Sequence, residues 1–301
     1  MARALPSCVK IYLNGEIVSR GEARIDPFDR GFVFGDGVYE GLRAFDGRVV
    51  GLSGHVARLA SGLAATGIPW DASLLGGVCE RLLEANSLRD AFIYMQCTRG
   101  APGPGEPVRS RVAAGPIRPT IFAYATPTPG LNTYAATPTK RAITTPDTRW
   151  LRGLIKSISL MGSVLAAYEA EAAGCDDAIL IRTMPGGEKL AAEGTSANLI
   201  AVVPAPDGTQ IVTPPLDGAP ILAGVTRDIL LAAAARRGVE IAVRNLPEHE
   251  LLAAREIMLC GTLTMVTAIT HLNGKPVGEG APGPETNRLL RVLVEAIGQG
   301  A

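Results

Sequence analysis

The sequence has few of the residues that build metal centres and disulfide frameworks. It holds 3 histidines and 5 cysteines in 301 residues, and it contains neither an HExxH nor a CxxC spacing. The cysteines, Cys8, Cys79, Cys97, Cys175 and Cys260, are odd in number and widely scattered. Zinc sites and disulfide-rich secreted folds need closely spaced or paired ligands. We therefore expect reduced thiols, a cytoplasmic location and no metal.

An excess of charge of one sign is also missing. The 29 Lys and Arg residues balance the 29 Asp and Glu residues. Binders of nucleic acid or of anionic membranes need a basic surface, so neither partner is expected. No apolar run approaches the roughly 18 residues that span a bilayer. The opening MARALPSCVK also lacks the long apolar stretch of a secretory signal.

What the sequence does have is the composition of a globular protein with mixed strands and helices. Hydrophobic residues make up 47% and charged residues 19%, enough apolar surface for a sizeable core. Alternating apolar residues and turn pairs predict strands, and a 3.6-residue period predicts helices. The fold class is therefore α/β or α+β. Predicted strands are 9–13, 17–19, 39–45, 49–52, 92–98, 120–125, 178–182, 198–203, 256–259 and 266–272, and predicted helices are 55–67, 74–85, 159–173 and 226–237.

Two segments rich in Gly and Pro divide the chain. Residues 100–115 (GAPGPGEPVRSRVAAG) predict a long loop, which in a compact domain is typically functional or disordered. The sequence TPTPGLNT at 126–133 is the best candidate for a linker. We expect a small domain at 1–125 and a larger one at 134–301.

Lys156 is the first candidate catalytic residue. It lies in RWLRGLIKSISL, among apolar neighbours and just before a predicted helix whose first turn would include Ser157 to Leu160. Partial burial, a nearby helix N-terminus and nearby arginines all favour a neutral, nucleophilic amine, as a lysine that attacks a carbonyl requires. From local sequence alone, a lysine that packs along an apolar surface and reaches water is the alternative.

Glu193 and the segment LAGVTRD are further candidates. Glu193 stands before GTSAN and an apolar strand, which predicts a carboxylate buried at a tight turn and suited to a protonated ring nitrogen. Gly224 allows close backbone approach, and Thr226 is a suitable N-cap for the following helix. The N–H groups at such a helix start can hold a phosphate. An ordinary turn acid and a plain capped helix are the alternatives.

Together these residues resemble the fold-type IV, class IV aminotransferases that use pyridoxal 5'-phosphate. The resemblance runs from about Ile11 to Leu290 and rests on motifs in the family's order. These are DRGFVFGDGVYEGLRAFDG, HVARL, YMQCTRG, WLRGLIKS, EAAGCDDAIL, AEGTSANL, LAGVTRD, CGT and LNGKPVGEG.

The resemblance implies a role for each matching residue. Lys156 would hold the cofactor covalently and later move the proton, Glu193 would pair with the ring nitrogen, and Arg58 would bind the phosphate. Tyr39 and Tyr94 are expected in the substrate pocket, although both could be plain core aromatics. The implied cofactor residues are Arg58, Lys156, Glu193, Ser196, Ala197, Asn198, Leu222, Gly224, Val225, Thr226 and Thr262, and the implied substrate residues are Arg30, Phe34, Tyr39, Arg43, Tyr94 and Leu263.

The resemblance also implies an architecture and a reaction. The family fold joins a small α/β domain to a larger pseudo-barrel domain. It is usually a homodimer in which a loop of one subunit covers the other's site, and residues 100–115 would be such a loop. The implied reaction moves an amino group from an amino acid or primary amine to a 2-oxo acid.

The motifs disagree on the substrate. YEGLRAF and GPETNRLL resemble branched-chain enzymes, whereas Asp29–Phe32, Tyr94–Gly100 and WLRGLIKS resemble D-amino-acid enzymes. Gln96 stands where branched-chain enzymes often have arginine, and Met161 where they often have tyrosine. The long loop lacks the Arg-x-His of D-amino-acid enzymes, which leaves Arg30 and Arg43 as carboxylate binders or as surface arginines. We favour D-amino acids or (R)-amines, with a branched-chain L-aminotransferase and an aminodeoxychorismate-lyase-like enzyme as alternatives.

Overall fold

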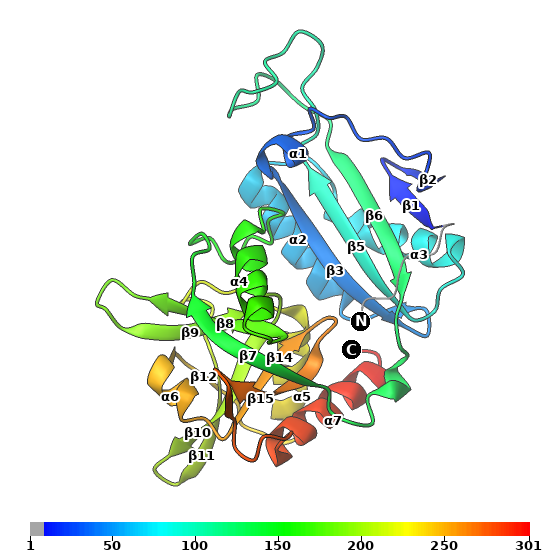
Figure 1. Ribbon diagram of the computed structural model, residues 1–301. Coiled ribbons are helices and arrows are strands. Elements are labelled where there is room, and N and C mark those ends of the chain that lie inside the picture. The colour runs from blue at the N-terminus through cyan, green and yellow to red at the C-terminus, as the bar shows by residue number, and fades with distance from the viewer. Residues whose placement is uncertain (1–8) are drawn as a thin grey trace. The chain divides into compact units, whose positions relative to one another are not determined.

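A computed structural model describes residues 9–301, so Cys8 and the opening residues lie outside it (Figure 1). The chain forms two units. The first runs to Gly130 and includes Ile155–Ser159; the second holds Leu131–Leu154 and Leu160–Ala301. The segment that carries Lys156 thus folds with the first unit. The predicted boundary after residue 125 stays a prediction; strand β6 continues to Pro127.

The first unit is built on a six-stranded sheet in which every neighbouring pair is antiparallel. Two of its hairpins turn at Asn14-Gly15 and at Asp46-Gly47, where all four residues have a positive φ, as the sequence predicts. Across the sheet the order is β2 (Glu16–Ser19), β1 (Lys10–Leu13), β6 (Thr120–Pro127), β5 (Ala91–Thr98), β3 (Gly37–Phe45) and β4 (Arg48–Val49).

Two helices cover one face of this sheet, and the two faces therefore differ. Ile93, Met95 and Cys97 of β5 are buried, whereas the alternating Phe92, Tyr94 and Gln96 are half-buried. The covering helices are α2 (Leu52–Thr66) and α3 (Leu75–Ala85), which follows the 3-10 turn η1 (Ala72–Leu74); a short helix α1 (Arg30–Phe34) precedes β3 (Figure 1).

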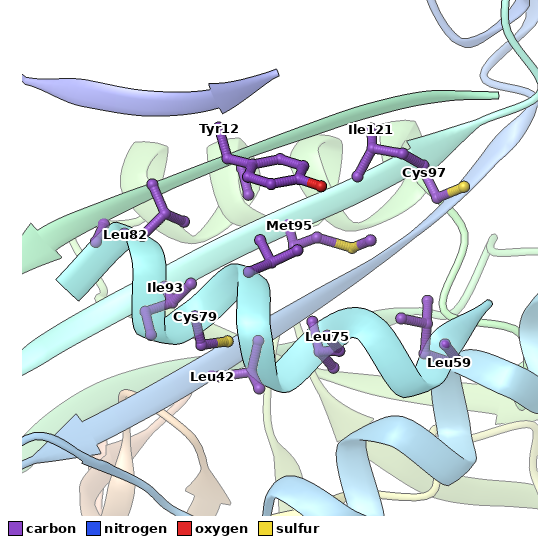
Figure 2. Close-up of a cluster of buried hydrophobic side chains, with 14 of the residues drawn as sticks. Tyr12, Leu42, Leu59, Leu75, Cys79, Leu82, Ile93, Met95, Cys97 and Ile121 are labelled. Carbon is purple, nitrogen blue, oxygen red and sulfur yellow. The ribbon is translucent and has the colours of Figure 1, made fainter. Parts of the chain in front are cut away.

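The core of the first unit lies between the sheet and these helices. Figure 2 shows Leu42, Ile93 and Met95 of the sheet meeting Leu59 of α2 and Leu82 of α3. Each of these five side chains is at most 1% exposed. Full burial of such a side chain contributes about 1.5–3 kcal/mol. The core holds β3 and α2 in place, and these two elements carry several of the site residues described below.

The second unit is a larger sheet that closes on itself. Strands β10, β14, β15, β7, β8 and β9 follow one another, and β9 pairs back onto β10 through Glu193 and Asn198. This closure makes a barrel, as expected from the resemblance. The strands are β7 (Thr139–Pro146), β8 (Asp177–Thr183), β9 (Lys189–Gly194), β10 (Asn198–Ala205), β11 (Gly208–Thr213), β12 (Ala242–Val243), β13 (Leu246–Pro247), β14 (Glu256–Gly261), β15 (Met265–Leu272) and β16 (Lys275–Pro276).

Four helices belong to the second unit. Ala166 and Ala170 of α4 pack on Ala178 and Leu180 of β8. The last helix, α7, starts at a carboxylate from a distant strand: Glu256 of β14 accepts the backbone N–H groups of Glu285 and Thr286 at 3.1 and 2.8 Å. The helices are α4 (Met161–Ala172), α5 (Val225–Arg236), α6 (Glu248–Leu252) and α7 (Pro284–Gly298), and a 3-10 turn η2 (Leu131–Thr133) precedes β7.

Several sequence predictions of local structure are wrong. The strand expected at 49–52 stops at Val49, and α2 begins at Leu52, because Gly51 adopts a left-handed conformation between them. The helix expected from Ser159 begins at Met161, so Ser157 is not in its first turn. Ser157 instead forms a bridge with Val38 of β3. Thr226 is not an N-cap, because Gly224 is the N-cap of α5.

The thiols within residues 9–301, which are Cys79, Cys97, Cys175 and Cys260, are free. Burial raises the pKa of Cys79, Cys97 and Cys260 to about 12, so these three thiols are poor nucleophiles. In that range no group of three His, Cys, Asp or Glu side chains is placed to hold a metal ion, and no helix is long and apolar enough to cross a membrane.

Candidate active site

Lys156 lies on a short segment that pairs with the start of β3. Its carbonyl accepts the backbone N–H of Tyr39 at 2.9 Å, and Gly37 accepts the N–H of Ile158 at 3.1 Å. The half-buried Lys156 side chain donates from Nζ to the hydroxyl of Tyr39 at 3.2 Å, and Nζ lies 4.2 Å from the centre of that ring. The structure thus joins two predicted site residues, and main-chain bonds hold the amine against an aromatic hydroxyl.

A row of aromatic rings extends from Tyr39 across the face of the sheet that α2 and α3 leave uncovered. Tyr39 stacks on Tyr94 with ring centres 5.5 Å apart, and Tyr94 stacks on Tyr124 at 5.3 Å. Tyr94 donates its hydroxyl to Oε1 of Gln96 at 2.9 Å. Burial raises the pKa of the Tyr94 and Tyr124 phenols, so both stay protonated near neutral pH. Sequence reasoning missed Tyr124, because its place beside Tyr94 depends on strand pairing.

Arg58 of α2, the predicted phosphate ligand, pairs with a carboxylate that sequence reasoning missed. Its Nε and Nη2 atoms donate to Oε1 and Oε2 of Glu40 at 2.9 and 2.6 Å. His55, one helical turn earlier, lies 2.7 Å from the same Oε2 through Nδ1. Spacing in HVARL places His55 and Arg58 on one helix face, but nothing in it shows that Glu40 of β3 lies opposite.

Arg30, a predicted carboxylate binder, is engaged within the first unit. It is 5% exposed, and its Nε donates to Asp36 at 2.9 Å. Its Nη1 and Nη2 donate to the carbonyls of Ser110 and Arg111 at 2.6 and 2.8 Å, so it fastens the long loop. The guanidinium groups of Arg30 and Arg109 lie 4.8 and 5.0 Å from the centre of the Phe34 ring. The substrate role of Arg30 stays a prediction that this geometry does not favour.

Arg43 is engaged in a similar way at the other end of β3. It is 3% exposed, and its Nη2 donates to the carbonyl of Pro129 at 2.7 Å. Its guanidinium also lies 4.6 Å from the centre of the Phe45 ring. These contacts indicate a structural arginine, and its predicted contact with a substrate carboxylate stays untested.

Glu193 lies in the second unit, at the point where the barrel closes. It is on β9 rather than in the following turn, and it is 4% exposed. Its carboxylate accepts Arg149 Nη1 at 2.5 Å, Asn198 Nδ2 at 3.1 Å and the backbone N–H of Leu222 at 3.2 Å. Three N–H donors favour the ionised carboxylate. Glu193 is therefore a negative charge fixed in place, as its predicted role requires.

The sequence predicts Arg149 only as a positive charge near Lys156, and it does not reveal the partners Asp147 and Arg182. Arg149 donates through Nε and Nη2 to Asp147 at 2.9 and 3.0 Å, and Arg182 reaches Asp147 at 3.0 Å. Burial lowers the pKa of Arg149, but bonds to Asp147 and the charge of Glu193 outweigh burial and raise that pKa above its ordinary value. Two arginines therefore balance two buried carboxylates.

The remaining predicted cofactor residues of the second unit gather around Asn198. Asn198 Nδ2 also donates to the carbonyl of Leu222 at 2.9 Å, and a Cβ on Gly224 would lie 1.8 Å from Asn198 Oδ1. The turn between β9 and β10 packs on Gly261, whose Cβ would lie 3.2 Å from that of Ala197. The structure therefore brings together Ser196, Ala197, Asn198, Leu222 and Gly224, with Val225 and Thr226 at the start of α5 and Thr262 and Leu263 following Gly261.

Comparison with known proteins identifies the family. The family model described as amino-transferase class IV matches residues 37–272. The chain belongs to the class IV aminotransferases. The D-alanine aminotransferase of Bacillus licheniformis is 33% identical over 297 residues, covering 96% of this chain and 97% of that protein. A putative branched-chain-amino-acid aminotransferase of Methanocaldococcus jannaschii is 34% identical over 287 residues, covering 93% and 94%.

Solved structures agree with this assignment. The branched-chain aminotransferase of Thermoproteus uzoniensis, solved with norvaline, superposes with a TM-score of 0.82 at 25% identity and covers 97% of this chain and 96% of its own. A branched-chain amino acid aminotransferase of T.th., solved with pyridoxamine 5'-phosphate, gives a TM-score of 0.83 at 26% identity, covering 96% and 94%. The fold is therefore fold type IV, and this class IV enzyme is a pyridoxal-phosphate-dependent aminotransferase.

The residues present fit pyridoxal phosphate. Helix α5 starts at Gly224 without a side-chain cap, so backbone N–H groups of its first turn can serve a phosphate. A side chain at Gly224 would clash with Asn198, and glycine keeps this helix start open. The amine of Lys156 suits the cofactor aldehyde, and the buried carboxylate of Glu193 suits its pyridinium nitrogen.

Proposed function

We propose that this aminotransferase moves an amino group from a D-amino acid or (R)-amine to a 2-oxo acid such as pyruvate or 2-oxoglutarate. The observation that carries the stereochemical proposal is the bond from Tyr94 to Gln96. A neutral amide stands where branched-chain enzymes often place a carboxylate-binding arginine. The D-alanine aminotransferase of Bacillus licheniformis, similar over 96% of this chain, supports the same choice.

The main predicted site residues then have distinct tasks. Lys156 would hold the cofactor through its amine, and the same amine would take up and return the proton at the substrate carbon. Tyr39 orients that amine through the 3.2 Å bond. Glu193 would keep the ring nitrogen protonated, and the cofactor, when bound, would supply an electron sink. Arg58, Val225, Thr226 and Thr262 would bind the phosphate, and Leu222 would pack on the ring.

The experiment is an absorption titration of the purified, cofactor-loaded protein. We expect D-alanine or (R)-1-phenylethylamine to bleach the yellow absorption and pyruvate to restore it. L-alanine and (S)-1-phenylethylamine, which differ from these donors only in configuration, are the controls and should leave the absorption unchanged.

Other results would replace this function with one of its alternatives. Bleaching by L-leucine, but by neither D-alanine nor the (R)-amine, would make the chain a branched-chain enzyme, as the similarity to the putative Methanocaldococcus jannaschii protein allows. Release of pyruvate from aminodeoxychorismate without a second oxo acid would make it a lyase. A protein that stays colourless with added pyridoxal phosphate would contradict every version.

We also propose that the enzyme is a cytoplasmic homodimer. Free thiols at Cys79, Cys97 and Cys260 suit a reducing compartment.

The support for a dimer is an apolar stripe on α4, here called the α4 patch. Its members share one helix face at i, i+3, i+4 and i+7 and are 41–68% exposed: Met161, Val164, Leu165 and Tyr168. Such a stripe is costly to leave in water and is typical of an interface.

A charge placed in the α4 patch should dissociate the dimer. We expect wild type to have twice the chain mass by light scattering and the double variant Leu165→Glu/Tyr168→Glu to have the mass of one chain. Leu252→Glu is the matched control, because Leu252 is 56% exposed on α6, outside the patch. A monomeric wild type, or a dimeric double variant, would contradict the proposed interface.

A further inference from the structure

Glu40 is a buried carboxylate to which the proposed reaction gives no task. It lies on β3, with its side chain on the face that α2 covers, among the core residues Val38 and Leu42. It is 0% exposed. A charge in such a place is strongly destabilising unless partners compensate it. The partners of Glu40 therefore indicate why it is there.

Two side chains of α2 compensate this charge. Arg58 forms a two-point fork with both carboxylate oxygens, at 2.9 and 2.6 Å, and His55 Nδ1 lies 2.7 Å from Oε2. Burial raises the pKa of Glu40, but the bonds from Arg58 and His55 outweigh burial and hold that pKa below its ordinary value. Glu40 is thus ionised near neutral pH.

The fork fixes the guanidinium of Arg58. A guanidinium is planar and carries five N–H donors, so two bonds along its Nε–Nη2 edge set the direction of all the others. An arginine held only by its own flexible side chain would lose rotamer freedom on binding a ligand. Because Glu40 is buried on β3, which pairs with β5 at this position, Arg58 is oriented before any ligand arrives.

We propose that Glu40 is a positioning residue that orients Arg58 toward the phosphate of the cofactor, with His55 holding Glu40 in place. This inference rests on the proposed role of Arg58 as phosphate ligand. Two effects oppose each other when Glu40 loses its charge. The charge of Arg58 is no longer neutralised by a carboxylate, which strengthens its attraction for a phosphate, but the guanidinium loses its fixed orientation. Since the Arg58 side chain is 10% exposed and set by the fork, orientation dominates.

The test compares pyridoxal phosphate with pyridoxal, which lacks the phosphate. We expect Glu40→Gln apoenzyme to bind pyridoxal phosphate about tenfold to a hundredfold more weakly than wild type, by analogy with the loss of a side chain that orients a metal ligand. Its affinity for pyridoxal should change by less than about twofold. Unchanged or tighter binding of pyridoxal phosphate, or equal weakening of both aldehydes, would overturn the proposal.

A double-mutant cycle separates positioning from general stabilisation. Arg58→Met should weaken pyridoxal phosphate selectively, and Glu40→Gln should add nothing in that background, because Glu40 acts through Arg58. An additive loss would overturn the proposal. Asp36→Asn is the matched control: Asp36 is bound at two points by Arg99, at 2.8 and 3.1 Å. Asp36→Asn should lower thermal stability but leave the ratio of the affinities for pyridoxal phosphate and pyridoxal unchanged.

Failure of this inference can be told apart from failure of the proposed function. A wild-type protein that attaches neither aldehyde to a lysine contradicts the proposed function itself. A wild-type protein that attaches both, with Glu40→Gln indistinguishable from it, leaves the function standing and overturns the role of Glu40.

Discussion

Replacement of Lys156 by alanine is expected to lower turnover by about 10⁴-fold, the upper end of what a positioned acid–base group contributes. The amine that attaches the cofactor and the base that moves the proton are then lost together. Borohydride reduction of wild type, followed by peptide mapping, should place the cofactor on Lys156. Turnover with D-alanine or the (R)-amine and pyruvate measures the kinetic effect.

The matched control for this variant is Lys189→Ala. Lys189 is an exposed lysine of β9 that reaches Glu248 at 3.4 Å. The Lys189→Ala variant should keep wild-type turnover, and reduction should still place the cofactor on its Lys156 peptide. A reduced cofactor found on any other lysine of the wild-type chain would show that the mechanism is wrong, whatever the activity of Lys156→Ala.

The family and fold could be predicted because they depend on motifs and on local patterns. The family model confirms the resemblance, and the barrel of the second unit is the expected architecture. Both hairpins at Asn14-Gly15 and Asp46-Gly47 appear where the turn residues indicate them. In such elements the local preference and the tertiary structure agree.

Elements that depend on distant partners could not be predicted. Helix α7 begins where Glu256 of β14 accepts its first N–H groups, a partner 29 residues away from Glu285. Ser157 was expected in the first turn of a helix, yet pairing with Val38 of β3 determines its conformation. Tertiary hydrogen bonds outweigh local propensity in both places.

The partners of the candidate site residues also lie far away in the sequence, so local patterns could not predict most of them. Motifs identified Lys156, Glu193 and Arg58, but their partners Tyr39, Arg149 and Glu40 come from other segments. Only Tyr39 among these partners was expected in the site. Arg30 shows the reverse case: its motif suggested a substrate ligand, whereas its donors bind carbonyls of the long loop 80 and 81 residues away.

The second large effect is expected from Glu193→Gln. The amide keeps the size of the side chain but removes its negative charge, so the ring nitrogen loses the partner that keeps it protonated. Turnover should fall by about a hundredfold to a thousandfold, the effect of removing one electrostatic partner of a developing charge. The amide N–H₂ would also face donors from Arg149, Asn198 or Leu222, at a cost of about 1–3 kcal/mol in stability.

Steady-state turnover and thermal unfolding of the same samples separate these two effects. Glu188→Gln is the matched control, because Glu188 is an exposed acid in the turn before β9, and it should leave both quantities unchanged. If Glu193→Gln lowers the unfolding temperature but keeps wild-type turnover, the carboxylate is a structural partner of Arg149 and Asn198. The pairing with the ring nitrogen would then have to be abandoned, since a buried amide cannot supply the charge which that role requires.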